Sequence, residues 1–339
     1  DWFAVSNIEE AFQIRKVGIK KPILILGYTP VSMAPQLAKL NISQAVFSEE
    51  YAERLSNNAS KNNVNVKIHI KVDTGMSRIG FLFQNINNHS HSIDTIEKVC
   101  NLKNIHAEGI FTHFARADED GVAINATNLQ YNNFIYIIKA LKKRGIDIPI
   151  SHCSNSGAIL NYKEFNLDMV RAGIILYGVY PSEYSKSNLK LEPAMALKTV
   201  ISQVKEVEPG TAVSYGSTYV TNKKTKIATV PIGYADGYFR SLSSKADMLI
   251  GGKRAPILGR ICMDQTMLDV TGIRDVEVNK IVTVFGKDNG ASITIDELAK
   301  KANTINYELL CAISKRVPRI YTKNGKNVGT LDYICPCLE

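Results

Sequence analysis

Short apolar segments alternate with helical segments through the first half of this 339-residue chain, and this alternation limits the possible folds more than any other feature. The apolar segments are rich in Ile, Val or Phe, as parallel strands covered on both faces are. Helical segments between them include Glu49–Asn57, His91–Val99 and Ala126–Lys143. The expected strands are Phe3–Val5, Ile23–Gly27, Ala45–Ser48, Val66–Val72, Ala107–His113, Ile150–His152 and Met169–Ile174.

Repeated strand–helix units form either a doubly wound sheet or a closed (β/α)8 barrel, and seven strands are one short of the barrel number. Ser6-Asn7 is expected to cap the helix after the first strand. Beyond Pro193 the pattern becomes β-like, with one late helix at Thr294–Asn303. The β segments are Thr199–Val207, Lys226–Pro231, Met248–Ile250, Ala255–Leu258, Met267–Val270 and Lys280–Val284. We therefore expect a (β/α) barrel domain over residues 1–190 and an all-β domain over residues 191–339.

Composition and charge narrow the function classes. No apolar run approaches the roughly 20 residues that span a bilayer, and we expect no signal peptide. The net charge of +9 comes from scattered lysines, which favours a solvated surface over nucleic-acid binding. The six cysteines form no paired CxxC motifs, as is typical of a reducing cytoplasm, and we expect no metal site. Cys335-Pro336-Cys337 could bind a metal or oxidise, but a frayed tail is the commoner explanation.

Polar residues gather where four of the expected strands end, the edge that carries chemistry in barrel enzymes. One polar residue at a strand end is ordinary, whereas four consecutive units indicate a site. The Ser156 hydroxyl and the Gly173 backbone suit a phosphate, with Arg171 facing the body of the ligand. A turn or helix cap is the alternative for Ser154-Asn155-Ser156. The segments are KVDTGMSR from Lys71, THFA from Thr112, HCSNSG from His152 and VRAGI from Val170.

Three further segments in the second domain combine tyrosine or methionine with glycine and aspartate. They surround Tyr215, Tyr234 and Met263-Asp264. Taken singly, such tyrosines are most often packed rings with a solvated hydroxyl.

Taken together, the motifs resemble the fold-type III amino-acid racemases that use pyridoxal 5′-phosphate (PLP), the alanine racemase family. The matching segments, in family order from residue 1 to about residue 320, are KVDTGMSRIG, FTHFARADE, SHCSNSGA, VRAGIILYG, VSYGSTY, PIGYADGY, GRICMDQ, NTINYEL and RVPR. The resemblance implies a PLP-binding (β/α)8 barrel followed by a β-domain. It also implies a segment resembling KANAYGHG, whose lysine bonds to PLP, before Asp1. That segment is absent from these 339 residues, so we expect the first barrel strand outside them, where a membrane domain could also lie.

The resemblance also assigns roles to individual residues. It implies racemisation by two bases, the lysine of the preceding segment and Tyr215, which reaches the site of the partner subunit in a homodimer. A cationic neighbourhood that favours tyrosinate is expected around Tyr215. At the cofactor, the resemblance implies Arg171 at the pyridine nitrogen with His152 behind it, and Ser156, Gly173, Ile174 and Tyr307 at the phosphate, with Asn155 in the same cofactor segment. It implies Arg78 at the cofactor phenolic oxygen and the substrate carboxylate, and Met263, Asp264 and Tyr234 around the substrate. It also implies His113 beside Tyr215 and a carbamylated Lys71, for which a surface Lys71–Asp73 pair is the alternative.

The expected function is racemisation of L-alanine to D-alanine for peptidoglycan by a cytoplasmic enzyme. A serine racemase of the glycopeptide-resistance type shares these motifs and is the first alternative, since a small pocket rejects an added hydroxyl only weakly. A non-catalytic PLP-binding module is the second, because the lysine segment is absent. Fold-type III decarboxylases and small PLP carriers fit less well, since decarboxylases lack the VSYGSTY and MDQ combination and carriers lack the β-domain.

Overall fold

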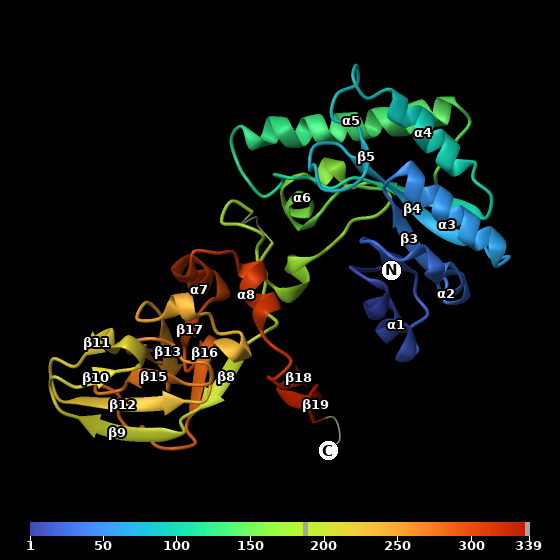
Figure 1. Cartoon of the computed structure of the whole chain (residues 1–339). Helices are drawn as coiled ribbons and strands as arrows, with labels where there is room; N and C mark the ends of the chain where they lie inside the picture. The colour runs from blue at the N-terminus through green and yellow to red at the C-terminus, as the bar shows by residue number, and fades with distance from the viewer. Residues whose placement is uncertain (186–188, 336–339) are drawn as a thin grey trace. The chain divides into compact units, whose positions relative to one another are not determined.

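A parallel sheet whose strands follow the chain order is the framework of the N-terminal unit, which comprises residues 1–176 and 180–191 (Figure 1). In this computed structural model, which describes residues 1–185 and 189–335, the sheet order is β1-β2-β3-β4-β6-β7, with β5 pairing β4. All these pairings are parallel, in the order of a (β/α)8 barrel, so the predicted fold class is confirmed. The strands are β1 Phe3–Val5, β2 Ile23–Ile25, β3 Ile42–Val46, β4 Val66–Asp73, β5 Phe81–Leu82, β6 Ile105–Phe111 and β7 Ile150–His152.

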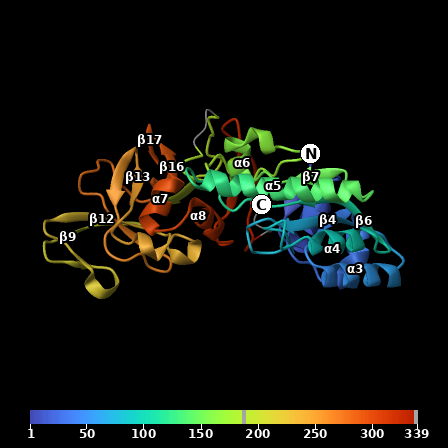
Figure 2. The same ribbon diagram turned by 90° about the horizontal axis from the view of Figure 1, so that it is seen from above.

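Helices follow these strands and bury their apolar faces against them. The first begins as predicted, because the Asn7 side chain accepts a hydrogen bond from Glu10 N at 3.0 Å. Helices α3, α4 and α5 succeed one another along the outside of the sheet (Figures 1 and 2). The helices are α1 Ile8–Lys16, α2 Ala34–Lys39, α3 Glu49–Lys61, α4 His91–Cys100, α5 Ala123–Lys143 and α6 Ser156–Asn161, with 3-10 turns η1 Val31–Met33, η2 Lys163–Phe165 and η3 Ile174–Tyr177.

The segment Met169–Ile174, predicted as a strand, is not one. Two backbone hydrogen bonds hold this part of the chain beside the end of β7, from Asp168 N to Ser151 O at 3.1 Å and from Arg171 N to Ser154 O at 2.9 Å. The Asp168 carboxylate also accepts from Ser151 N at 2.8 Å, so a side chain takes the N–H that a ladder carbonyl would take. The segment runs beside β7 without a regular ladder and carries Arg171 to the end of that strand.

The C-terminal unit, which comprises Tyr177–Val179 and the chain from Glu192 onward, is built of antiparallel strands. A three-stranded sheet has the order β15-β12-β9, a five-stranded sheet has the order β14-β13-β16-β17 with β8 on β16, and β10-β11 and β18-β19 form two-stranded pairs. The elements are β8 Leu197–Val200, β9 Gln203–Val207, β10 Ala212–Val213, η4 Tyr215–Ser217, β11 Tyr219–Val220, β12 Thr225–Val230, η5 Tyr234–Asp236, η6 Arg240–Leu242, β13 Asp247–Ile250, β14 Lys253–Pro256, β15 Thr266–Asp269, β16 Ile281–Asp288, β17 Ala291–Ile293, α7 Ile295–Ala302, α8 Asn306–Ala312, β18 Arg319–Lys323 and β19 Lys326–Leu331.

Two predictions in this unit are wrong in detail. The segment Thr199–Val207 is two strands in different sheets, because Ile201 N donates to Lys280 O at 3.0 Å and Ser202 N donates to Thr229 O at 2.9 Å. The chain therefore changes sheets between these two residues. The late helix is followed by a second helix, α8, which was missed because NTIN, before its apolar residues, resembles a loop.

Two further observations bear on the expected properties of the chain. No helix among the described residues is long and apolar enough to cross a bilayer. The cysteines in the described part of the chain are free thiols, at positions 100, 153, 262, 311 and 335. Pro336 and Cys337 of the C-terminal motif lie outside the described residues.

Candidate functional site

The guanidinium of Arg171 is fixed at the ends of β6 and β7. Its Nη1 donates to His152 Nδ1 at 2.7 Å, and its Nη2 donates to Thr112 O at 2.8 Å and Cys153 O at 3.1 Å. The Phe111 ring lies 5.3 Å from Arg171 Cζ and stacks on the His152 imidazole, with centroids 4.8 Å apart. Arg171 Nε has no hydrogen-bond partner among the described residues. One N–H of a rigidly held cation is thus available to an acceptor on a ligand.

The positive charge at this site is carried by arginine and not by histidine. Burial, reinforced by the charge of Arg171, lowers the pKa of His113 to about 3 and holds the pKa of His152 well below its usual range. Burial also lowers the pKa of Arg171, to about 10, which leaves the guanidinium charged at neutral pH. The expected cationic neighbourhood therefore does not include a protonated His113.

His113 has hydrogen-bond donors on both sides of its ring. Arg171 Nη2 lies 3.4 Å from Nδ1, and Asn155 Nδ2 lies 3.4 Å from Nε2. The Asn155 amide is oriented independently, because its oxygen accepts from Ala158 N at 3.0 Å and its nitrogen donates to Phe114 O at 3.2 Å. A neutral imidazole accepts at one nitrogen only. One of the two approaches is therefore not a hydrogen bond, and that side of the ring is free to donate to another group.

Lys71, near the end of β4, is 3% exposed and donates from Nζ to Val72 O at 2.9 Å. Burial is the main cause that lowers its pKa to about 7; Arg171 and Arg78 lower it further, and Asp73 opposes them. Asp73 is 4% exposed, so neither residue belongs to the surface, and the alternative of a Lys71–Asp73 surface pair is wrong. Near pH 7 a substantial fraction of Lys71 is a neutral, nucleophilic amine.

Asp73 instead organises the turn that carries Arg78. Its Oδ1 accepts from the backbone N–H groups of Gly75 at 3.0 Å, Met76 at 2.9 Å and Ser77 at 3.0 Å. Burial raises the pKa of Asp73, but these three hydrogen bonds and the charge of Lys71 outweigh it and lower the pKa overall. Arg78 is exposed at the end of this turn, and its charge acts on both Lys71 and His113.

Ser156 and Gly173 meet beside Arg171. Asn155 caps α6, as the alternative interpretation of this motif proposed, and Ser156 is the first residue of the helix. Gly173 N donates to Ser156 Oγ at 2.9 Å, and a Cβ at position 173 would lie 3.3 Å from that oxygen. Ile174 follows and is buried. The structure thus brings together three of the four residues that the resemblance assigns to a phosphate; Tyr307 lies in α8 of the other unit.

Two buried polar groups of this unit were not predicted from the sequence. Gln130 of α5 donates from Nε2 to Thr74 Oγ1 at 3.3 Å and to His113 O at 3.2 Å, and accepts from Ala115 N at 2.9 Å, which joins the ends of β4 and β6. Nothing in the sequence distinguishes Gln130 from an exposed helix residue. His69 of β4 is fully buried, and its signal was present: Lys67, His69 and Lys71 alternate along one face of an otherwise apolar strand.

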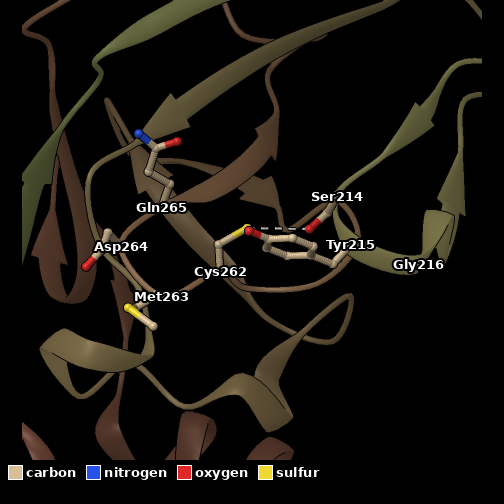
Figure 3. A pocket seen from close by; sticks show the side chains of 7 residues that line it. All are labelled: Ser214, Tyr215, Gly216, Cys262, Met263, Asp264 and Gln265. Carbon is tan, nitrogen blue, oxygen red and sulfur yellow. Dashed lines mark hydrogen bonds between the residues drawn. The ribbon is translucent and has the colours of Figure 1, made fainter.

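In the C-terminal unit, Tyr215 lies at an open pocket of about 600 Å³ (Figure 3). The lining residues are Ser214, Tyr215, Gly216, Cys262, Met263, Asp264 and Gln265, so Tyr215, Met263 and Asp264 are brought together as the resemblance implies. Ser214 has φ +67° and donates from Oγ to Arg260 O at 2.5 Å, which holds the turn before Tyr215. Tyr215 is 69% exposed and Met263 is 53% exposed.

Tyr234 begins the 3-10 turn η5, which is hydrogen-bonded to a residue that lines the same pocket. Tyr234 N donates to Cys262 O at 3.1 Å, and Gly233 packs so closely there that a Cβ would lie 2.3 Å from Cys262 O. Arg316 of the RVPR motif donates to Asp264 Oδ1 at 2.8 Å and lies 3.7 Å from Asp236 Oδ1. Tyr307 is half-buried in α8 and is not among the pocket residues.

Comparisons with known proteins agree along nearly the whole chain. The family model of the alanine racemase N-terminal domain matches residues 1–181, and that of the C-terminal domain matches residues 194–321. The chain is 48% identical over 332 residues to an alanine racemase of Clostridium perfringens, a match that covers 98% of this chain and 84% of that protein. A solved alanine racemase of Clostridium difficile is 41% identical, with a TM-score of 0.91 over 98% of this chain and 85% of that one. An alanine racemase of Bacillus anthracis with bound L-Ala-P is 36% identical, with a TM-score of 0.87 over 97% of this chain and 83% of that one.

Proposed function

The chain belongs to the alanine racemase family, and on this basis we propose that it interconverts L- and D-alanine with PLP as cofactor. The observation that carries the proposal is the Arg171 guanidinium, whose terminal nitrogens are held by His152 and backbone carbonyls while Nε is available to a ligand. Arg171 belongs to the segment VRAGI, which is one of the sequence motifs that resemble the family.

The residues present fit PLP. Arg171 Nε is a donor for the pyridine nitrogen, and Arg78 is a second cation at the same edge for the phenolic oxygen and the substrate carboxylate. We assign Ser156, Gly173 and Ile174 to the phosphate. The Ser156 hydroxyl accepts from Gly173 N and keeps its own O–H to donate to an anion. We place Tyr307 at the phosphate from the resemblance alone.

Bound PLP supplies an electron sink that acidifies the Cα proton of an amino acid. Arg171 limits the strength of that sink, because a guanidinium does not give up its proton and so leaves the pyridine nitrogen unprotonated. His152 keeps the guanidinium in place from behind. A weaker sink suppresses side reactions, which suits an enzyme whose only task is to invert one centre.

Inversion needs one base on each face of the Cα atom. We assign one face to Tyr215, contributed by the partner subunit of a homodimer, with His113 of the receiving subunit beside it. The exposure of Tyr215 and Met263 supports such an interface, since aromatic and apolar side chains at a pocket are commonly covered by a partner. We assign the other face to the lysine that the family resemblance implies.

Met263, Asp264 and Tyr234 would then close the substrate pocket from the partner side. Arg316 holds Asp264 through a 2.8 Å hydrogen bond, so the carboxylate is oriented before substrate binds. A pocket narrowed by Tyr234 suits the methyl group of alanine. This favours alanine over serine, the alternative substrate.

We also assign a carbamate to Lys71. The neutral amine attacks CO2, forming an N–C bond and releasing one proton, which replaces a buried cation by an anion. The low pKa of Lys71 supports this, since only the neutral amine reacts. The carbamate would face Arg78, whose charge already acts on Lys71, and would orient it toward the substrate.

The test is the racemisation of L-alanine and L-serine by the holoenzyme, followed by the loss of optical rotation. We expect kcat/KM for L-alanine to exceed that for L-serine by about ten-fold to a hundred-fold. Equal or reversed values would reassign the substrate to serine. A holoprotein that binds PLP but racemises neither amino acid would support the non-catalytic module.

A further inference from the structure

A continuous line of buried groups extends from Arg171 into the interior of the sheet. Arg171 Nη1 contacts His152 Nδ1 at 2.7 Å, and His152 Nε2 lies 2.9 Å from His69 Nδ1. His69 Nε2 then lies 3.6 Å from Glu108 Oε1. Both histidines are 0% exposed, and Glu108 is 9% exposed. In the proposed reaction only the contact between Arg171 and His152 has a role, and His69 and Glu108 have none.

The backbone conformation of β4 and β6 positions these groups in line. The pairing of β4 with β6 shifts register between Ile68 and His69, so that Glu108 is an extra residue in β6. Such a bulge re-aims a side chain. The next residue is Gly109, where a Cβ would lie 2.2 Å from His69 Nδ1. The bulge places the carboxylate, and the absent side chain leaves room for the His69 ring.

The hydrogen-bond chemistry allows one proton arrangement only. A guanidinium is donor-only, so His152 Nδ1 must accept, and a neutral imidazole then carries its proton on Nε2. His152 is neutral, because burial and the charge of Arg171 hold its pKa well below the usual range. His152 Nε2–H therefore donates to His69 Nδ1, and His69 must be neutral with its own proton on Nε2.

That last N–H points at Glu108. His69 Nε2 is buried and has no hydrogen-bond partner among the described residues, and the Glu108 carboxylate lies 3.6 Å from it. The carboxylate is itself held, by Ser43 Oγ on Oε1 and by Lys67 Nζ at 3.6 Å from Oε2. Burial raises the pKa of Glu108, but His69, Ser43 and Lys67 together lower it, so the group is ionised.

We propose that Glu108 and His69 are positioning residues that lock His152 in its Nε2–H tautomer, so that His152 Nδ1 always accepts from Arg171. Without the carboxylate, His69 is free to carry its proton on Nδ1. His152 would then face an N–H on each side and could not hold the guanidinium. The consequence for PLP rests on the proposed function, whereas the tautomers themselves do not.

The first experiment measures the tautomers directly in the full chain. The protein is labelled with 15N-histidine, and long-range 1H–15N correlation spectra are recorded between pH 6 and 8. The chain has six histidines, and His69→Asn and His152→Asn identify the two signals. We expect both imidazoles to be neutral Nε2–H tautomers throughout. A charged His69, or a His69 protonated at Nδ1, would refute the proposal whether or not the protein binds PLP.

The second experiment compares three variants at the carboxylate. Glu108→Leu removes the acceptor, and Glu108→Gln keeps an acceptor oxygen without the charge. Lys67→Met, the matched control, removes only the partly exposed partner of the same carboxylate. We expect Glu108→Leu to give mixed His69 tautomers and to weaken PLP binding, measured by absorbance titration, about ten-fold, the effect of one hydrogen bond. Glu108→Gln and Lys67→Met should stay within about three-fold of wild type.

The outcomes separate positioning from a structural role. If Glu108→Leu lowers thermal stability but leaves the tautomers and PLP affinity unchanged, the residue is structural only and the proposal is wrong. If Lys67→Met weakens PLP binding as much as Glu108→Leu, the effect does not pass through His69 and the proposal is again wrong. If Glu108→Leu does not fold, the tautomers of the wild-type protein and the result for Glu108→Gln decide whether the proposal holds. Failure of the wild-type protein to bind PLP would overturn the proposed function and leave the tautomer result standing.

Discussion

The backbone N–H of Gly173 donates to the hydroxyl of Ser156 at 2.9 Å and joins the segment that carries Arg171 to the first residue of α6. A hydroxyl that accepts this bond still has its own O–H to donate. The two residues thus present a backbone segment and a donor side by side, at the place where we propose the cofactor phosphate. Because Gly173 N is hydrogen-bonded to Ser156 Oγ, a substitution of Ser156 removes the hydroxyl donor and also the hydrogen bond that holds the backbone at Gly173.

Ser156→Ala should weaken PLP binding about ten-fold, since it removes a charge-assisted hydrogen bond worth roughly 1.5 kcal/mol. Absorbance titration with PLP measures the effect. Ser154→Ala is the matched control, because its hydroxyl is buried two residues earlier and donates instead to Phe165 O at 3.1 Å. Equal weakening by both variants would contradict the assignment of Ser156 to the phosphate.

We predict that the free energy of unfolding depends on pH through the titration of Lys71. Its pKa is about 7 in the folded protein and 10.5 when solvated, so between these values the unfolded chain binds a proton that the folded one does not. Stability therefore rises with pH in that window, by at most about 1.4 kcal/mol per pH unit. Urea unfolding in CO2-free buffer, followed by the fluorescence of the single tryptophan, Trp2, should show this slope in wild type relative to Lys71→Met. A stability difference between the two proteins that does not change with pH would contradict it.

The proposed carbamate on Lys71 can be observed without an activity assay. Protein equilibrated with 13C-bicarbonate near pH 8 should show a carbamate carbon signal in its NMR spectrum, because the buried amine is largely neutral there. Lys71→Arg provides the control, since a guanidinium does not react with CO2. A signal of equal size in both proteins would assign the carbamate to another amine, and its absence from wild type would exclude the modification.

Shared active sites predict complementation between two inactive variants. Tyr215→Phe and Arg171→Ala should each lose most of the activity as homodimers. In a mixed dimer, one site carries both changes and the other carries neither, so random mixing should restore about a quarter of wild-type kcat. The measurement is racemase activity after joint refolding or co-expression. If the mixture stays as inactive as its components, Tyr215 and Arg171 serve the same site from one subunit.

We predict that acid lowers the stability of the C-terminal unit, because Glu297 becomes protonated. Arg254 donates to both of its carboxylate oxygens, at 2.6 and 2.8 Å, and is the main cause that lowers the pKa of Glu297 from 4.5 to about 2. This stabilisation is complete above pH 4.5 and is lost as the pH falls toward 2. Glu297→Gln should cost about 2 kcal/mol at pH 7 and progressively less in acid, measured by chemical unfolding. Glu50→Gln should cost nothing measurable, because the Glu50 side chain is 82% exposed and its partner Arg54 is 60% exposed.

Much of the local structure could be predicted because it depends on neighbouring residues. The Asn7 cap of α1 and the start of α3 at Glu49 are encoded within one helical turn. The predicted strand at Met169–Ile174 failed because Asp168, through its side chain, occupies the N–H of Ser151. The change of sheet at Ile201 and Ser202 also escaped prediction, since it depends on two partners far along the chain.

The sequence by itself determined the repeated strand–helix pattern, the β-rich second half and the polar strand ends at Lys71, His113, His152 and Arg171, because side-chain chemistry and turn residues are local properties. Only the tertiary structure decided that Lys71 is buried with a pKa near neutrality and that His113 is uncharged. It alone showed that Glu108, His69 and His152 stand in line behind Arg171. The physical reason is that protonation and tautomer depend on desolvation and on groups brought close by folding, and neither is written in any short stretch of residues.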